Sequence, residues 1–352
     1  MTFDVKFLIR PHLKNFKAYS SARSEYTGHE AVFLDANENP IGSASGNAVN
    51  RYPDPLQTKV KQGISKIKNI SPAQIFIGNG SDEAIDLLYR AFCEPKTDNV
   101  ITCPPTYGMY ETCAHLNDIE LREVLLSEDF QLRVDEILAQ VDRHTKMIFV
   151  CSPNNPTGNI LKRQDILKLL SNFQGLVVVD EAYIDFSNEP SWIGKIADCP
   201  NLVVMQTFSK AWGMAGIRMG TAYASAEIIS LLSAIKPPYN VNALTQNEAL
   251  KALSCSELKD QMVHEIIEQR AILLKEIASL KYVQKIYPTD SNFALIKVDD
   301  ANKLYHFLTS HQVIVRNRTS TPLCHNCVRI TIGTATENTE LMHWMNEFSE
   351  MQ

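Results

Sequence analysis

Short apolar runs alternate with helical stripes of apolar residues through the first two thirds of the chain. The runs are rich in Val, Ile and Phe at successive positions, which is typical of parallel strands buried on both faces. We predict strands at residues 73–77, 99–103, 146–151, 176–180 and 202–207. Helical patterns separate several of these runs, such as the stripe formed by Ala84, Leu87, Leu88 and Ala91. Strands that alternate with helices imply right-handed crossovers, so the pattern predicts an α/β fold with a doubly wound sheet.

The pattern changes after Pro237-Pro238. Long helical patterns at 242–253 and 257–280 precede shorter elements, which is typical of a smaller α+β domain. We predict strands near 282–287, 293–298, 312–316 and 327–332, and helices near 301–310 and 336–348. The expected organisation is an N-terminal segment, 1–35, that packs with the small domain, a large domain, 36–250, and a C-terminal small domain, 251–352.

Composition and charge favour a cytoplasmic protein that acts on small molecules. The formal net charge is −6 at pH 7, and no Lys/Arg cluster offers the basic face that nucleic-acid binding needs. No apolar run approaches the ~20 residues of a membrane span, and the first residues lack the apolar core of a secretory signal. The eight cysteines are scattered without a regular framework, as expected of reduced thiols in the cytosol.

Polar segments follow several of the predicted strands. Because ligands bind beyond the carboxyl ends of strands in open α/β sheets, we expect these segments to meet in one cluster. They are 152–158, 180–183, Ser209-Lys210 and Gly80-Ser81-Asp82. Lys210 lies between Phe208 and Trp212. A lysine in apolar surroundings has a lowered pKa and can act as an amine nucleophile, and a helix start such as Gly80-Ser81 can hold a phosphate.

Each of these features alone has an ordinary structural interpretation as a turn, a helix cap or a surface lysine. Together they are more specific. An Asp after one strand, a Lys after a later one and phosphate-binding groups nearby form the constellation of a pyridoxal 5'-phosphate (PLP) site, in which a Schiff-base lysine is combined with an acidic partner for the pyridine nitrogen. We therefore predict Lys210 and Asp180 as the centre of a PLP site.

With these residues in view, the sequence resembles the fold-type I PLP-dependent aminotransferases of the class II subgroup, and within them the histidinol-phosphate aminotransferase family. The similarity covers nearly the whole chain. The matching motifs are Tyr19–Arg23, Asn37–Pro40, Arg51–Asp54, Gly78–Glu83, Ser152–Gly158, Asp180–Tyr183, Phe208–Ala211, Ala215–Arg218 and Val328–Thr331. The resemblance implies a large domain built on a mostly parallel seven-stranded sheet, with a smaller α+β domain.

The resemblance also implies roles for the cofactor-binding residues. Lys210 would bind PLP as a Schiff base and then move the substrate's Cα proton, while Asp180 would pair with the pyridinium nitrogen. Asn155 and Tyr183 would hydrogen-bond the phenolic oxygen of PLP, and Tyr107 would stack on the pyridine ring. The cofactor phosphate would be held by Gly80, Ser81, Asp82, Thr207, Ser209 and Arg218. Tyr52 would reach the phosphate of the neighbouring subunit, which implies a homodimer.

Substrate binding is implied for a second set of residues. Arg329, with Asn155, would bind the acidic end of the substrate, while Arg316 and the phenol of Tyr19 would bind a substrate phosphate. Arg318 is near enough to Arg316 to be the phosphate ligand in its place. The stretch 319–326 departs from the family pattern.

The implied reaction is a reversible transamination. L-Histidinol phosphate and 2-oxoglutarate give imidazole-acetol phosphate and L-glutamate in histidine biosynthesis. An aromatic aminotransferase or a phospho-amino-acid decarboxylase of the same fold is the alternative enzyme. A regulatory sensor domain related to aminotransferases is the non-enzymatic alternative, but the family match begins by about residue 10 and leaves no space for the DNA-binding domain that such regulators carry.

Two other motifs are weaker. Gly78-Asn79-Gly80 could open a dinucleotide fingerprint, but the third glycine position is occupied by Glu83, whose carboxylate would face a pyrophosphate. Cys324 and Cys327 have the spacing of half a zinc site, but no second Cys/His pair has a comparable close spacing. We therefore expect neither a nicotinamide cofactor nor a bound metal.

Overall fold

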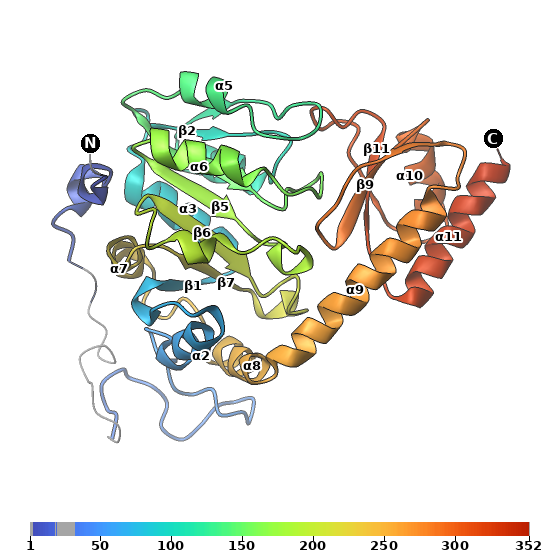
Figure 1. Cartoon of the computed structure of the whole chain (residues 1–352). Helices are drawn as coiled ribbons and strands as arrows, with labels where there is room; N and C mark the ends of the chain where they lie inside the picture. The colour runs from blue at the N-terminus through green and yellow to red at the C-terminus, as the bar shows by residue number, and fades with distance from the viewer. Residues whose placement is uncertain (1–2, 18, 20–31, 352) are drawn as a thin grey trace.

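The computed structural model describes residues 3–17, 19 and 32–351, in which a large sheet and a small sheet lie side by side (Figure 1). The large sheet has the strand order β1-β7-β6-β5-β4-β2-β3. Its strands are β1 (Ile75–Asn79), β2 (Asn99–Thr102), β3 (Glu120–Glu123), β4 (Thr145–Cys151), β5 (Leu176–Asp180), β6 (Leu202–Thr207) and β7 (Met219–Tyr223). β7 pairs antiparallel with β1 and β6, and all other neighbouring strands of this sheet pair parallel. The predicted α/β fold with a mostly parallel seven-stranded sheet is confirmed.

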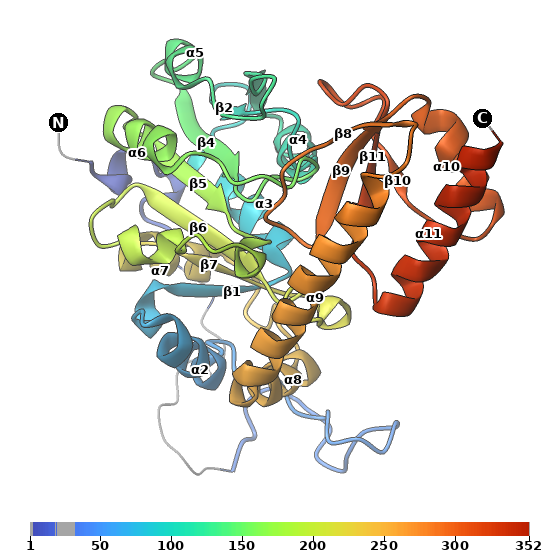
Figure 2. The ribbon, with the colours of Figure 1, turned by 45° about the vertical axis from the view of Figure 1, so that its right-hand side comes forward.

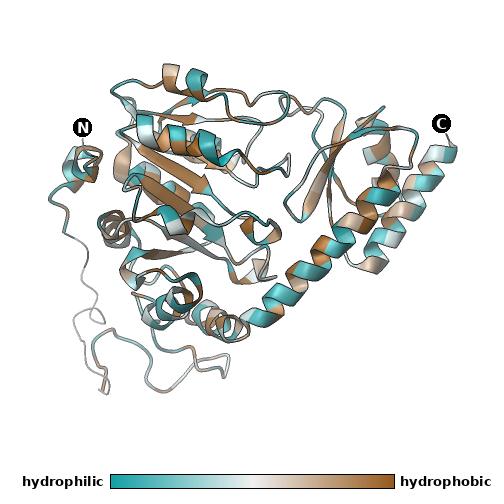
Figure 3. Ribbon diagram, in the orientation of Figure 1, coloured by the Kyte–Doolittle hydropathy of each residue, from teal (hydrophilic) through white to brown (hydrophobic). Residues whose placement is uncertain are grey.

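Helices cover both faces of the large sheet because successive side chains of a strand point to opposite faces. On β5, Val177 and Val179 pack in one apolar cluster, and Leu176 and Val178 pack in the other. The first cluster includes α2 (Thr58–Lys68), α5 (Val134–Ala139), α6 (Arg163–Asn172) and α8 (Ala243–Ser254), and the second includes α3 (Ser81–Phe92), α4 (Met109–Leu116) and α7 (Ala226–Ile235). Figure 3 shows the resulting apolar strands between helices of mixed polarity.

The small sheet is antiparallel throughout, with the order β10-β11-β9-β8. Its strands are β8 (Val283–Ile286), β9 (Phe293–Val298), β10 (Arg316–Asn317) and β11 (Cys327–Thr331), and its helices are α9 (Ser256–Ile277), α10 (Ala301–Ser310) and α11 (Ala335–Glu350). The long helix α9 runs from beside α8 to the small sheet (Figures 1 and 2). No helix in the described part of the chain is both long and apolar enough to cross a membrane.

Two predictions differ from the structure. The strand expected at 312–316 begins only at Arg316, because Gln312 adopts a left-handed conformation with φ of 64° in the turn after α10. The N-terminal segment, where it is described, packs with the large domain and not with the small one. Val5 is buried in the cluster formed by α3, α4 and α7, and the backbone amide of Arg10 donates to the carbonyl of Ala91. The apolar residues of 3–9 therefore extend the core of the large domain. The domain boundary near residue 250 stays a prediction.

Candidate active site

A cavity of about 620 Å³ lies where the carboxyl ends of the parallel strands meet the small domain. Most of the residues predicted from the sequence line it, although they come from distant segments of the chain. They are Gly80, Ser81, Asp82, Tyr107, Asn155, Asp180, Tyr183, Thr207, Ser209, Lys210, Arg218, Arg316 and Arg329. The cavity is also lined by Thr106, Gly108, Met109, Cys151, Ala182, Ala215 and Arg318. The segments that follow the strands therefore meet at one site, and the small domain contributes arginines to it.

Asp180 is a buried carboxylate at the end of β5, with only 3% of its surface exposed. It accepts hydrogen bonds from the Tyr110 hydroxyl at 2.7 Å and from the backbone amide of Ala182 at 3.0 Å. Burial raises the pKa of Asp180 to about 6 in spite of these bonds. No Lys or Arg of the described residues forms a salt bridge with it. A buried carboxylate without a cation is costly, so this site favours a cationic ligand group.

Tyr110 was not predicted as a site residue. Its hydroxyl fixes one Asp180 oxygen, and its ring stacks on Phe149 of β4 with the ring centroids 4.7 Å apart. In the sequence, Tyr110 looks like an ordinary apolar position of a short helix. Its role depends on the side of α4 that faces the sheet, which no local pattern reveals.

Lys210 follows β6 and reaches the cavity from the segment Thr207–Lys210. Its ammonium nitrogen lies 5.6 Å from the centre of the Tyr183 ring. Desolvation and the charge of Arg329 lower the pKa of Lys210, while Asp180 acts in the opposite direction. A lowered pKa increases the fraction of neutral amine, which is the form that attacks a carbonyl.

The first turn of α3 forms an anion cradle with Arg218. Gly80 precedes the helix with φ of 82°, and a Cβ atom there would lie 2.8 Å from Nη2 of Arg218. At Gly220 of β7, a Cβ atom would lie 2.1 Å from the backbone nitrogen of Ser81, so glycine is needed for the helix to sit on the strand. The free amides of this turn and the nearby guanidinium suit a phosphate.

The carboxylate of Asp82 is held by two neighbouring side chains. It accepts a hydrogen bond from the Tyr107 hydroxyl at 3.0 Å and lies 3.5 Å from Nη2 of Arg218. Across the cradle, the Thr207 hydroxyl oxygen accepts from the amide of Ser209 at 3.1 Å. Asp82 thus orients Arg218 and Tyr107, and its backbone amide remains in the first turn of the helix.

Three arginines of the small domain line the opposite side of the cavity. Arg316 on β10 is directly opposite Arg329 on β11, and Arg318 follows two residues later. Arg329 donates to Oδ1 of Asn155, but none of the three forms a salt bridge within the described ranges 3–17, 19 and 32–351. Like charges placed opposite each other on neighbouring strands are unfavourable, so this arrangement favours a bound anion.

Of the three arginines, Arg318 shows most clearly an unused donor for a bound anion. Its Nε is buried and has no hydrogen-bond partner among the described residues. Burial, together with the charges of Arg329 and Arg316, lowers the pKa of Arg318 to about 10. The sequence could not decide between Arg316 and Arg318, and the structure brings both to the cavity.

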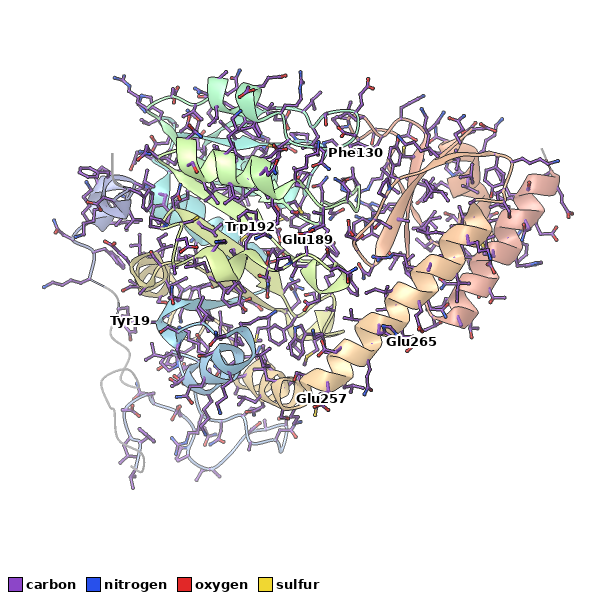
Figure 4. The ribbon with its side chains drawn as sticks, in the orientation of Figure 1. Tyr19, Phe130, Glu189, Trp192, Glu257 and Glu265 are labelled. Carbon is purple, nitrogen blue, oxygen red and sulfur yellow. The ribbon has the colours of Figure 1, made fainter. Side chains whose placement is uncertain are left out.

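Tyr19 and Tyr52 do not line the cavity of this chain. Tyr19, in the N-terminal segment, is 76% exposed and lies on the side of the large domain away from the small one (Figure 4). Tyr52 is half exposed and stacks on Tyr239, with the ring centroids 4.3 Å apart. Residues 20–23, which complete the motif that begins at Tyr19, lie outside the described residues. The contributions expected of Tyr19 and Tyr52 stay predictions.

The loop 318–326 is a series of turns, and Arg318 at its start lines the cavity. Backbone amides of Thr321 and Cys324 donate to the carbonyls of Arg318 and Thr321, at 2.8 and 3.0 Å. Cys324 of this loop and Cys327 of β11 are buried free thiols. No group of three or more possible metal ligands occurs among the side chains that the structure describes. Both cysteines pack in the same apolar cluster as Tyr287 and Leu295.

The cavity thus combines an amine of lowered pKa, a buried acid without a cation and a helix-end cradle for an anion. These three features fit PLP, whose carbonyl, pyridine nitrogen and phosphate need those partners. A second group of cationic side chains is left over for a substrate anion.

Comparisons with known proteins agree with this chemistry. Residues 22–344 match the family model for aminotransferase class I and II. The chain therefore belongs to the class I and II aminotransferases, which are enzymes that use PLP. A histidinol-phosphate aminotransferase of Cytophaga hutchinsonii is 53% identical over 342 residues, covering 97% of this chain and 98% of the relative. Another, of Flavobacterium johnsoniae, is 54% identical over 340 residues, covering 96% of each chain. More narrowly, the chain belongs to the histidinol-phosphate aminotransferase family.

A solved structure supports the same fold. The histidinol-phosphate aminotransferase of Sinorhizobium meliloti, crystallised in complex with pyridoxal-5'-phosphate, superposes with a TM-score of 0.80 at 21% identity, over 90% of each chain. This similarity shows the fold. The predicted family, fold type and cofactor are therefore confirmed, whereas the roles of individual residues stay proposals.

Proposed function

We propose that the protein catalyses the reversible transamination between L-histidinol phosphate and 2-oxoglutarate, which gives imidazole-acetol phosphate and L-glutamate, in L-histidine biosynthesis. The observation that carries this proposal is the unpaired arginine group opposite Lys210, formed by Arg316, Arg318 and Arg329. A phosphate monoester carries up to two negative charges, and several guanidiniums suit it better than one.

The residues around Lys210 would have different roles in the reaction. Bound PLP would supply a carbonyl that accepts the amino group and a ring that accepts electrons. Lys210 would bind that carbonyl and then carry the proton to and from the substrate Cα. Asp180 would hold a proton on the pyridine nitrogen, since its buried charge has no other cation. Asn155 and Tyr183 would hydrogen-bond the phenolic oxygen, while Tyr107 would cover the ring.

The substrate arginines are expected to differ in selectivity. Both substrates carry an anionic end, but only histidinol phosphate carries a phosphate. Replacing Arg316 or Arg318 with Ala should raise KM for histidinol phosphate by about 10- to 100-fold, which corresponds to the loss of charged hydrogen bonds. KM for glutamate should change much less, because Arg329 would still bind its carboxylate. Steady-state kinetics with both substrates measures this difference.

The exposed Arg143 provides the matched control, since Arg143→Ala removes the same charge outside the cavity. Equal losses for histidinol phosphate and glutamate would show that the replaced arginine does not select phosphate. Comparison of Arg316→Ala with Arg318→Ala also decides which of the two is the stronger phosphate ligand.

A substrate panel tests the proposed reaction itself. The panel contains histidinol phosphate, aromatic amino acids and threonine phosphate, each with 2-oxoglutarate, and CO2 release is monitored. We expect the highest kcat/KM for histidinol phosphate and no CO2. Faster turnover of aromatic amino acids would favour an aromatic aminotransferase, and CO2 from threonine phosphate would favour a decarboxylase. Either result would overturn the proposed substrate.

A homodimer with shared active sites is part of the proposal. Apolar side chains are exposed along the segment before α2, including Val32, Leu34, Ile41 and Leu56, and Leu244 of α8 is exposed nearby. Such a surface suits an interface between two copies. It would bring Tyr52 of each subunit to the other's cofactor phosphate. We also propose the cytosol as its location, in keeping with eight free cysteines.

A further inference from the structure

The segment after α7, residues 236–241, contacts two functional parts of the large domain at once. One is the phosphate turn, residues 77–83, which belongs to the active site of the same chain. The other is the Tyr52 arm, residues 51–56, which in the proposed dimer serves the neighbouring active site. Neither Tyr239 nor Asn240, at the centre of the segment, lines the cavity.

The Tyr52 arm is held by side chains of this segment. Tyr239 stacks on Tyr52 with an interplanar angle of 16°. Lys236 is 8% exposed, and its Nζ donates to the carbonyl oxygen of Pro55 at 3.0 Å. Gln246 of α8 donates to the carbonyl of Asp54 at 3.0 Å. The backbone of the arm is therefore anchored, and the Tyr52 ring itself has Tyr239 as its stacking partner.

The phosphate turn is held by Asn240. Its Nδ2 donates to the carbonyl of Ile77 and to Oε2 of Glu83, both at 3.0 Å. The same Glu83 oxygen accepts from the backbone amide of Asn79. Asn240 thus braces both sides of the turn that leads through Gly80 into the first amides of α3.

A buried glutamine joins the two halves. Nε2 of Gln57 donates to Oδ1 of Asn240 at 3.2 Å and to the carbonyl of Pro55 at 2.8 Å. Gln57 is 1% exposed and adopts a left-handed conformation with φ of 50°. Such a conformation is unfavourable for a residue other than glycine and persists where the surroundings demand it. A single buried side chain thus connects the arm to the residue that holds the turn.

We propose that Tyr239 and Asn240 are positioning residues for two active sites: Asn240 sets the phosphate turn of its own subunit, and Tyr239 sets the direction of Tyr52 for the cofactor phosphate of the neighbouring subunit. This inference rests on the proposed dimer. Its physical basis is that a half-exposed aromatic side chain has several rotamers, and stacking on Tyr239 selects one of them before the partner's phosphate is met.

Hybrid dimers test the assignment because they separate the two sites. One chain carries Lys210→Ala, so each hybrid, purified through two different affinity tags, has one working lysine. Tyr239→Ala is placed either on the Lys210→Ala chain or on the chain with the working lysine. The cofactor is removed, and PLP is titrated back while the visible absorbance band of the PLP–Lys210 adduct is followed. Only the working site contributes to this band.

Tyr239→Ala on the Lys210→Ala chain should raise the PLP concentration for half-saturation by about tenfold, because the working site then receives the loosened Tyr52. On the other chain the same substitution should have little effect. Both hybrids contain the same set of substitutions, so a general loss of folding would not distinguish them. Tyr239→Phe, which keeps the stacking ring, should restore tight binding in either arrangement.

Asn240→Ala is expected to show the opposite dependence, with weaker PLP binding when it is on the chain that carries the working lysine. If a substitution weakened PLP binding equally on either chain of the hybrid, the inference for that residue would be overturned. Tyr52→Phe hybrids distinguish this outcome from failure of the dimer proposal. If Tyr52→Phe acts only from the Lys210→Ala chain, the shared site is correct and a negative result concerns Tyr239 alone. If Tyr52→Phe weakens PLP binding from either chain or from neither, or if ultracentrifugation shows an active monomer, the dimer proposal itself fails.

Discussion

Replacing Lys210 with Ala is expected to abolish transamination and the visible absorbance of the PLP–lysine adduct together. The lysine would lose two functions in one step, the covalent bond to the cofactor and the transfer of the Cα proton. General acid–base catalysis alone contributes up to about 10⁴-fold, so kcat should fall by at least that factor. Single-turnover kinetics and absorbance spectra of the PLP-loaded protein measure the two losses.

Lys195→Ala is a suitable control, because Lys195 is a surface residue paired with Asp198 and does not line the cavity. It should leave both readouts unchanged. If Lys210→Ala kept the absorbance band, another amine would have to bind the cofactor, and the assignment of this lysine would be wrong.

Asp180→Asn should lower kcat by about 10²- to 10³-fold, the usual effect of removing one preorganised electrostatic partner from an active site. Asparagine keeps the size of the side chain but cannot stabilise a protonated pyridine nitrogen through its charge. Asp180→Glu keeps the charge and should lose less activity unless the longer side chain displaces Tyr110. A variant that retained full activity with Asn at position 180 would refute the pairing role.

The same variant is expected to change how stability depends on pH in the PLP-free protein. The pKa of Asp180 is about 6 in the folded chain and near 4 when unfolded, so folding favours the protonated form. The protonated Asp180 side chain is compatible with the fold, so its full contribution to the free energy of unfolding is present below pH 4 and is lost as the pH rises through 6. The difference between the two pKa values corresponds to a loss of about 3 kcal/mol in the free energy of unfolding. The Asp180→Asn variant should not show this loss, and urea unfolding of both proteins at pH 5 and pH 8 measures the difference. If the stability of the variant and that of the unmodified protein changed with pH in parallel, the expectation would be wrong.

The strand ends explain why much of the site could be predicted from the sequence. Buried parallel strands have a strong apolar pattern, and a polar residue directly after such a run must lie near the ligand edge of the sheet. Asp180 is the last residue of β5, Lys210 lies in the segment that follows β6, and Gly80 directly follows β1. All three line the same cavity.

Other features depend on tertiary packing or on a second chain, which local patterns do not encode. Tyr110 matters because α4 turns it towards Asp180. Val5 belongs to the large-domain core, although the irregular sequence around it shows no periodicity. Tyr52 does not line the cavity of its own chain, and only the family resemblance gave it a role. The sequence left Arg316 and Arg318 as alternative phosphate ligands, and the structure adds that Nε of Arg318 is buried without a hydrogen-bond partner among the described residues.

The side chains around the cavity carry a charge opposite to that of the whole protein. The chain has a net charge of −6, yet one lysine and four arginines line the site beside two aspartates, namely Lys210, Arg218, Arg316, Arg318, Arg329, Asp82 and Asp180. The low-dielectric walls of a concave site focus the positive electrostatic field of these side chains toward the solvent. Anionic metabolites would consequently be drawn toward the opening before any contact forms, and the rate of their diffusional encounter with the enzyme would decrease as salt screens the field.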